Sequence, residues 1–240
     1  MEETKTVQPL LSDVDEQVLK GNVQRVLKML EDNRYQDEPP ARLIAVTKTV
    51  APKVINQLKE LGILDIGENR AQVALPKMPE IAPEFRLHLI GRLQTNKVKD
   101  IIDMVCVLHS LDRIELAREV DRRARQHGRV LPALVQVNIA GEEQKGGIPP
   151  QDVEAFLREM RHYPNIHVEG LMAIMPLAAS EEELDRLLGE MRTLFEEMRG
   201  LNSEGVEMRE LSLGMSNDYR IAARNGATMV RVGTALYRRD

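Results

Sequence analysis

The sequence predicts an α/β protein folded as a single (β/α)8 TIM barrel with an extra helix at its N-terminal end. Three observations predict this class. From residue 40 onward, short apolar segments alternate with segments of helical periodicity; the apolar segments number eight; and no G-x-G-x-x-G sequence follows the first of them. A doubly wound open sheet shares the alternation, but the count of eight and the missing dinucleotide signature favour the barrel.

The eight apolar segments are short and almost uniformly hydrophobic. This pattern is typical of parallel strands that are buried on both faces of the sheet. The predicted strands are residues 42–48, 63–69, 86–91, 104–110, 131–139, 167–174, 210–214 and 229–234.

The predicted helices follow from apolar residues spaced three and four apart. One opens at Pro52 and stops at Gly62, where proline and glycine are the usual boundary residues. Others occupy residues 111–128, 180–200 and 218–226, and a further helix with apolar positions from Val14 to Leu30 precedes the first strand. No linker or low-complexity segment interrupts the pattern, so residues 1–240 are expected to form one domain, with residues 1–12 disordered.

The composition narrows the functional class. Hydrophobic residues make up 42% and charged residues 30%, which is ordinary for a globular protein. The net charge of −5 argues against a dedicated nucleic-acid binder. No apolar stretch approaches the roughly 20 residues that span a bilayer, and the acidic N-terminus lacks the apolar core of a signal peptide, so we expect a cytoplasmic protein without a membrane partner.

Metal and disulfide chemistry are not expected. The single cysteine, Cys106, cannot form an intramolecular disulfide or a cysteine-based metal site. His88 and His109 lie in apolar segments and are interpreted as core or rim residues, because no cluster of Asp, Glu or His at metal-ligand spacing accompanies them.

Lys48 is the first candidate site residue, because (β/α)8 barrels gather their function at the C-terminal ends of the strands. It closes the first predicted strand after a run of apolar residues. Its amine either reaches water at the rim or acts as a nucleophile towards an aldehyde. Strand position alone favours the rim interpretation.

Two segments near the end of the sequence point to a phosphate group. Ser216 follows the seventh strand, and Gly233-Thr234 closes the eighth. Ser216 taken alone is best explained as the N-cap of its own helix. The two segments together match the usual phosphate site of the barrel, between strands seven and eight. Met172 and Met215 lie at strand ends and are also expected to line this pocket.

Seven motifs occur in order over residues 40–237: AVTK, GENR, HLIGRLQTNK, VNIAGEEQKGGI, GLMAIMP, LSLGMSNDY and MVRVGTALY. Together they resemble the pyridoxal 5′-phosphate (PLP) homeostasis protein family, whose barrel is similar to the N-terminal domain of bacterial alanine racemase. The resemblance implies PLP as the cofactor, with Lys48 as the Schiff-base lysine and Arg231 at the pyridine nitrogen. It also implies that Asn69 and Ser212 lie near the cofactor and that Lys145 assists transfer. The residues implied at the phosphate are Ser216, Gly233 and Thr234. Arg70 and Arg92 depart from the family pattern, which concerns the rim of the site.

A carrier is predicted rather than an enzyme. Most PLP enzymes place a carboxylate at the pyridine nitrogen, whereas a guanidinium such as that of Arg231 only donates and needs an unprotonated nitrogen. Racemisation tolerates such a ring but needs a second base, which alanine racemase supplies from a C-terminal domain that is not expected here; Tyr219 and Tyr237 remain candidates. The prediction is a cytoplasmic monomer or weak dimer, with no catalytic residues, that holds PLP for buffering or for delivery to apo-PLP enzymes. The alternatives are a weak amino-acid racemase and a barrel enzyme that uses Lys48 in sugar-aldehyde chemistry.

Overall fold

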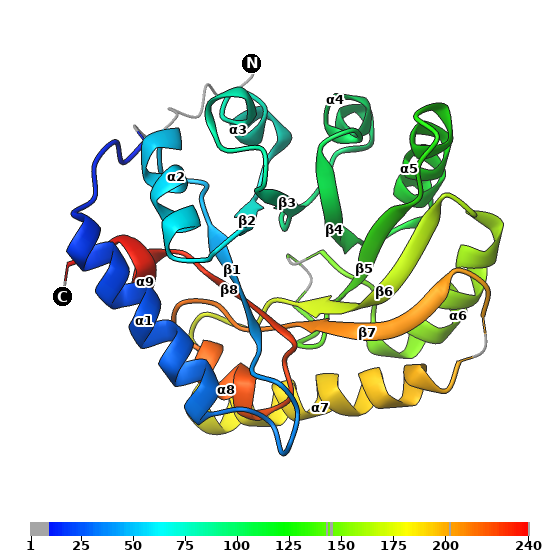
Figure 1. Ribbon diagram of the computed structural model, residues 1–240. Coiled ribbons are helices and arrows are strands. Elements are labelled where there is room, and N and C mark those ends of the chain that lie inside the picture. The colour runs from blue at the N-terminus through cyan, green and yellow to red at the C-terminus, as the bar shows by residue number, and fades with distance from the viewer. Residues whose placement is uncertain (1–9, 143, 145, 202, 240) are drawn as a thin grey trace.

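Eight parallel strands close into a barrel in the order β1 to β8, and helices surround it (Figure 1). The computed structural model describes residues 10–142, 144, 146–201 and 203–239. The strands are β1 (Arg42–Val46), β2 (Asp65–Glu68), β3 (Arg86–Leu89), β4 (Val105–Leu111), β5 (Leu131–Val137), β6 (Ile166–Ala173), β7 (Val206–Ser212) and β8 (Met229–Val232). Each coincides with one of the eight apolar segments, so the predicted barrel is confirmed.

The strand β7 is the one whose start the sequence misplaces. It begins at Val206, four residues before the predicted segment, because its first half carries exposed Glu207 and Arg209 and lacks a continuous apolar run. The barrel closes where β1 pairs with β8 in parallel register, with Ile44 opposite Arg231. This pairing joins the two ends of the sequence that carry the candidate site residues.

The five helices predicted from periodicity are all present. They are α1 (Glu16–Asp32), α2 (Pro52–Glu60), α5 (Ile114–Gln126), α7 (Glu181–Arg199) and α8 (Tyr219–Arg224). The sequence missed α3 (Ala71–Ala74), α4 (Val98–Ile101), α6 (Val153–Glu159) and α9 (Thr234–Tyr237), which are too short to display a helical period. Single 3-10 turns occupy Met78–Glu80, Thr95–Lys97, Pro150–Asp152 and Met160–His162.

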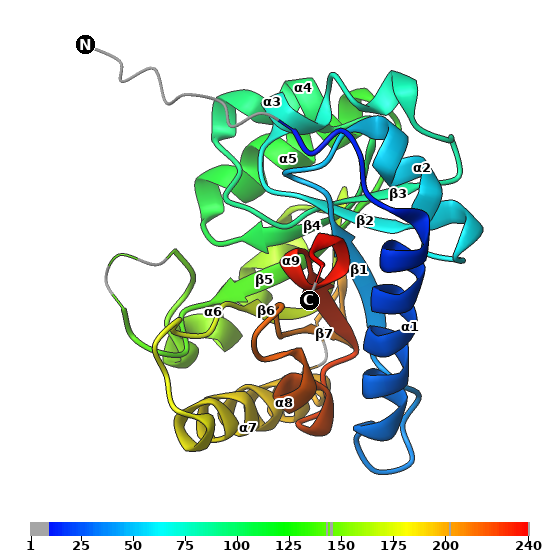
Figure 2. The same cartoon turned by 90° about the vertical axis from the view of Figure 1, so that its left-hand side faces the viewer.

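The predicted extra helix, α1, packs against the C-terminal end of the chain (Figure 2). The Asp15 carboxylate caps it by accepting from the backbone N–H groups of Gln17 and Val18. The buried Asn22 amide donates to the carbonyl oxygens of Leu236 (3.1 Å) and Arg238 (2.8 Å). The extra helix therefore fixes α9, which begins at a candidate phosphate residue.

The N-terminal segment predicted to be disordered lies only partly within the described residues. Leu11 forms an isolated parallel bridge with Val50, donating to the Thr49 carbonyl and accepting from the Ala51 N–H. Leu11 is thus paired with the segment that follows β1, and the disorder of residues 1–12 stays a prediction. Among the helices that the structure describes, none combines the length and apolar character needed to cross a membrane.

The interior of the barrel is separate from the apolar layer between barrel and helices. On β8, Val230 and Val232 belong to that outer apolar layer, and the intervening Arg231 faces the other way, since successive strand residues alternate in direction. Buried polar residues lie on several strands, among them His88, His109 and Ser212. A polar barrel interior is unusual, because branched aliphatic side chains normally fill it.

We predict that Gly170→Ala destabilises the fold by about 1–3 kcal/mol or more, because a Cβ built at Gly170 would lie 1.7 Å from the carbonyl oxygen of Glu210 and would force β6 from β7. Gly21→Ala is the matched control. It lies in α1 with no other described residue within 4 Å of its new Cβ, and it should stabilise the fold by about 0.5–1 kcal/mol. Urea unfolding followed by circular dichroism measures both. A Gly170→Ala protein as stable as wild type would contradict the close approach.

Candidate functional site

A cavity of about 500 Å³ opens at the C-terminal ends of the strands. Its walls come from residues that follow β1, β2, β3, β6, β7 and β8, together with a side chain of α7. They are Val46, Lys48, Thr49, Asn69, Ile90, Gly91, Ile174, Met175, Pro176, Leu177, Leu184, Met215, Ser216, Asn217, Asp218, Arg231, Gly233, Thr234 and Arg238. Seven of the predicted site residues therefore line one cavity.

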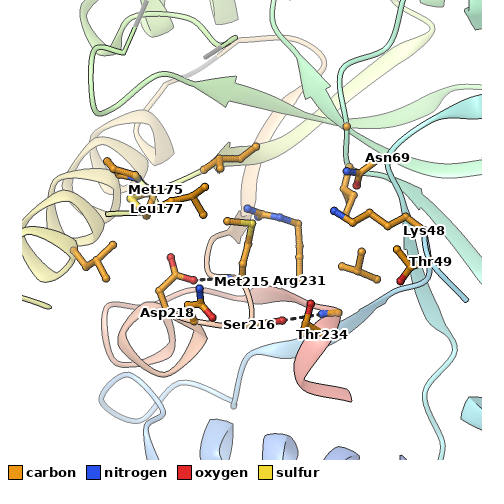
Figure 3. A pocket seen from close by; sticks show the side chains of 18 of the residues that line it. Lys48, Thr49, Asn69, Met175, Leu177, Met215, Ser216, Asp218, Arg231 and Thr234 are labelled. Atoms are coloured by element: carbon orange, nitrogen blue, oxygen red, sulfur yellow. Dashed lines mark hydrogen bonds between the residues drawn. The ribbon is translucent and has the colours of Figure 1, made fainter. Parts of the chain in front are cut away.

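Lys48 follows β1 and is exposed to the cavity. Figure 3 shows its side chain extending into the cavity with Asn69 beside it. Within the described part of the chain, its ammonium group has no ion pair and no hydrogen bond. A solvent-accessible amine without a carboxylate partner is free to react with an aldehyde once it loses its proton.

The backbone next to Lys48 is fixed by a buried cluster of Thr47, Glu68 and Lys77. The Lys77 Nζ donates to the Glu68 Oε1 (2.8 Å) and to the carbonyl oxygen of Thr47 (2.7 Å), and the Thr47 hydroxyl donates to the same Glu68 oxygen (2.7 Å). The side chains of Lys77 and Glu68 are only 5% and 2% exposed. Because the Thr47 carbonyl belongs to the peptide bond before Lys48, this cluster sets the direction in which Lys48 leaves the strand.

Arg231 lies across the floor of the cavity and is almost completely buried. Its Nη1 donates to the hydroxyl and the carbonyl oxygen of Ser212 (both 2.7 Å), and its Nη2 donates to the Ala173 carbonyl (2.8 Å). Burial lowers its pKa to about 10, partly opposed by the carboxylate of Asp218, so it is still a cation at neutral pH. A guanidinium has five N–H groups. These three bonds leave two for a ligand that can accept.

The loops after β7 and β8 form a cradle of hydrogen-bond donors. The Ser216 hydroxyl accepts from the backbone N–H groups of Gly233 (3.2 Å) and Ala235 (3.4 Å), so the two loops meet (Figure 3). Among the described residues, the backbone N–H groups of Ser216 and Thr234 donate to no other group. Gly214 has φ +81°, and a Cβ there would lie 2.6 Å from the Ala222 Cβ, so only glycine permits this turn. Clustered N–H and hydroxyl groups of this kind suit a phosphate.

Asp218 is a cavity residue that the sequence did not indicate. It accepts a hydrogen bond from the backbone N–H of Met215, which holds the loop after β7. Burial raises the pKa of its carboxyl, although the Met215 N–H and the Arg231 charge act in the opposite direction. Its position immediately before α8 is the only sequence signal that could have drawn attention to it.

Part of the remaining cavity wall is apolar, although Thr49, Asn217 and Arg238 also line it. Ile90 and Met175 follow β3 and β6, and Leu177 stands at the rim with 85% of its surface exposed. These were also missed, since a hydrophobic residue at a strand end looks the same as one in the core. Such a wall can cover the face of a flat ring.

Two predicted residues, Met172 and Ser212, are not among the described residues that line the cavity. Met172 and Ser212 are Cα partners on β6 and β7 and are fully buried. Ser212 therefore reaches the cavity only through Arg231. Lys145, the predicted transfer residue, lies outside the described residues. Over the part of the chain that the structure describes, no group of three or more His, Cys, Asp or Glu is placed to hold a metal ion.

The residues present fit one kind of ligand: a flat ring with an aldehyde near Lys48, a phosphate at the Ser216–Thr234 cradle and a hydrogen-bond acceptor facing Arg231. PLP has all three groups. The amine, the two remaining guanidinium N–H groups and the cradle are donors, and the ring would lie between apolar side chains. The donor set therefore fits the cofactor that the sequence motifs imply.

Comparison with known proteins identifies close relatives. A family model described as alanine racemase, N-terminal domain, matches residues 14–239. The chain is 37% identical over 217 residues to the pyridoxal phosphate homeostasis protein of Aquifex aeolicus, covering 89% of this chain and 94% of the relative. It is 35% identical over 201 residues to the protein of the same name from Synechocystis, covering 83% and 91%.

Solved structures agree with this similarity. PipY of Synechococcus elongatus with PLP bound is 31% identical, with a TM-score of 0.81 over 92% of this chain and 100% of that one. Alanine racemase of Clostridium difficile shares the fold at 15% identity, with a TM-score of 0.78 over 98% of this chain and 60% of the racemase.

We predict that Lys77→Met destabilises the protein by about 3–5 kcal/mol, because it leaves the Glu68 carboxylate buried without its cation. The double variant Lys77→Met/Glu68→Gln removes both charges and should recover most of the loss. Lys28→Met, which breaks an exposed pair with Asp32, is the control and should cause no measurable change. Guanidinium unfolding measures all three. Equal losses for the single and double variants would show that the pair is not the source of the stability.

Proposed function

The chain belongs to the pyridoxal phosphate homeostasis protein family, and from this we propose that it binds PLP through a Schiff base at Lys48 and holds it for buffering or delivery rather than for turnover. The observation that carries the proposal is the convergence of Lys48, Arg231 and the phosphate cradle on one cavity. The PLP-bound relative PipY, which has the same fold, supports it.

In the proposed complex, each part of the cavity has one task. When bound, PLP supplies an aldehyde carbon that combines reversibly with a primary amine. Lys48 provides that amine and Asn69 lines the wall beside it. Ser216, Gly233 and Thr234 hold the phosphate, and Met215 lies against the ring. Arg231 donates to the ring nitrogen through N–H groups not used by Ser212 and Ala173.

The guanidinium of Arg231 is the reason why we propose that the bound PLP does not turn over substrates. A guanidinium has no acceptor atom, so it pairs only with an unprotonated ring nitrogen. A ring that lacks the extra proton withdraws electrons weakly, and decarboxylation or transamination would be slow. Lys48 then acts as a tether.

The position of the tyrosines weighs against the racemase alternative. Racemisation needs a base on each face of the substrate carbon, and Lys48 would provide only one. Neither Tyr219 nor Tyr237, the two candidates for the second base, is among the described residues that line the cavity. The Tyr237 ring is buried, and burial raises the pKa of its hydroxyl, which opposes a role as a base.

The cellular setting is part of the proposal. We place the protein in the cytoplasm as a monomer or weak dimer, with PLP and apo-PLP enzymes as partners and with neither nucleic acid nor membrane. Lys145 is proposed to assist transfer to those enzymes.

We predict that purified protein mixed with PLP acquires a visible Schiff-base band that disappears on borohydride reduction. The reduced protein should carry one phosphopyridoxyl mass on the peptide containing Lys48. Lys48→Ala should remain colourless after the same treatment. Lys53→Ala, at an exposed lysine paired with Asp13, is the matched control and should behave as wild type. Labelling that persists in Lys48→Ala, or a wild-type protein that PLP cannot colour, would refute the assignment.

We also predict that the PLP-loaded protein restores activity to an apo-PLP enzyme faster than Lys145→Ala does, with equal PLP binding by the two proteins. The loaded wild-type protein should cause no sustained α-deuteration of L-amino acids in heavy water. Mass spectrometry follows deuteration, and the activity of the recipient enzyme follows transfer. Deuteration at multiple turnovers would favour the racemase alternative, and failure of transfer would leave buffering alone as the role.

A further inference from the structure

A chain of buried side chains leads from Arg231 through the interior of the barrel to its opposite end. The Arg231 Nη1 and the Ser212 Oγ are 2.7 Å apart, and the Ser212 Oγ lies 3.1 Å from the His109 Nδ1. The His109 Nε2 lies 2.9 Å from the His88 Nδ1, and the His88 Nε2 lies 2.9 Å from the Asp65 Oδ1. We call Ser212, His109, His88 and Asp65 the histidine relay; all four are at most 5% exposed.

The two ends of the relay fix its direction. The Arg231 guanidinium can only donate, so the Ser212 oxygen accepts from it. At the other end, burial acts to raise the pKa of Asp65, but hydrogen bonds from His88 and Arg86 outweigh burial and hold that pKa at about 2. Asp65 is therefore a carboxylate at neutral pH and only accepts, so the His88 Nε2 carries a proton.

The two ends then determine which nitrogen of each histidine carries a proton. In a neutral imidazole one nitrogen donates and the other accepts. A neutral His88 that donates from Nε2 must accept at Nδ1, so the His109 Nε2 donates to it. His109 in turn accepts at Nδ1, and the donor there is the Ser212 hydroxyl. In this arrangement every donor along the line faces an acceptor.

Charged groups stand at both ends of the relay. Arg86 from β3 binds Asp65 through Nε (2.8 Å) and Nη2 (2.6 Å), and Arg42 from β1 approaches Asp65 at 3.9 Å. Arg231 from β8 adds a cation at the other end. Burial lowers the pKa of His109 well below its usual value, and the nearby cations Arg231 and Arg42 add to the effect.

Protonation of an imidazole would reverse the line of donors. The His109 Nδ1 would then carry a hydrogen towards Ser212, and the serine oxygen would face two donors without giving its own proton to the relay. The neutral arrangement alone lets the Ser212 hydroxyl donate to His109 while it accepts from Arg231. The orientation of that hydroxyl therefore depends on both histidines.

We propose that the histidine relay positions Arg231 towards the bound cofactor, so that its two remaining N–H groups face the pyridine nitrogen and hold it unprotonated. The relay residues are positioning residues, since none of them lines the cavity. The inference rests on the proposed function, because it assumes PLP at Arg231. It explains why polar side chains occupy a barrel interior that is normally aliphatic.

The first test does not involve PLP. In the ¹⁵N NMR spectrum of the cofactor-free protein, His88 and His109 should both carry hydrogen on Nε2, and His109 should remain neutral between pH 6 and 8. His127, His162 and His167 lie at or near the surface and provide reference signals in the same spectrum. Hydrogen on Nδ1 of either relay histidine would overturn the proposed direction of the relay.

The second test compares two substitutions of His88 in protein loaded with ¹⁵N-labelled PLP. The amide of His88→Gln can still accept from His109 and donate to Asp65, whereas His88→Leu can do neither. The pyridine ¹⁵N shift should be that of an unprotonated ring in wild type and His88→Gln, and should move towards the protonated value in His88→Leu. The dissociation constant of PLP should rise about tenfold in His88→Leu only, as expected for loss of one charge-assisted hydrogen bond.

If His88→Leu does not fold, the same measurement can be made on Ser212→Ala. This variant deletes only the hydroxyl, leaving Arg231 bound to the backbone carbonyl groups of Ser212 and Ala173. It should shift the pyridine ¹⁵N signal in the same direction as His88→Leu. Wild-type signals in Ser212→Ala would overturn the proposal. Failure of PLP to bind wild type would refute the proposed function instead, and the first test would still report on the relay.

Discussion

The parallel pairing of β1 with β8 is the constraint on which the site depends. It places Ile44 opposite Arg231, so that residues almost at the two ends of the sequence become neighbours on the barrel. Lys48 leaves the end of β1, and the Gly233–Thr234 part of the cradle leaves the end of β8. Without closure, the amine and the phosphate donors would lie on opposite edges of a sheet. The helix α1 supports this junction from outside, because Asn22 donates to the carbonyl oxygen of Leu236 in α9 and to that of Arg238 just after it.

Closure also buries charge, and networks of hydrogen bonds hold two of the buried cations in place. The Lys77–Glu68 pair stands behind Lys48, and the histidine relay stands behind Arg231. An ion buried without a partner costs several kcal/mol, so these networks tolerate little change. They lie beneath the two groups proposed to contact the cofactor. The Lys77–Glu68 pair orients the peptide bond before Lys48, and the relay is proposed to orient the guanidinium of Arg231. The polar interior is thus explained by the demands of the site.

The sequence predicted what depends on local pattern. Apolar runs gave the eight strands, and the position of Lys48 and Gly233-Thr234 at strand ends gave their place in the cavity. The pairing of Glu68 with Lys77 could not be predicted, since it depends on how the loop after α3 folds back against β2. Asp218 escaped notice because its burial comes from tertiary packing. His88 and His109 were correctly interpreted as interior residues, but a sequence does not reveal that two histidines on adjacent strands meet. The depth of Met172 in the barrel could not be predicted either. The alternation of side chains along a strand tells which face a residue takes, but it does not tell how far along the barrel axis the residue lies.

The contrast between Lys48, which follows β1, and Lys77, which follows α3, clarifies why the site suits a carrier. Lys77 is buried, and its ammonium group is bound to the Glu68 carboxylate. Lys48 is exposed and has no described carboxylate partner, and the rim above it includes Leu177, which is 85% exposed. Enzymes that control reactive intermediates exclude water from such a bond. A lysine that water or a second amine can reach forms a bond that is easily exchanged, and exchange is what uptake and release of a cofactor require. The same exposure that would weaken a catalyst therefore serves the proposed function.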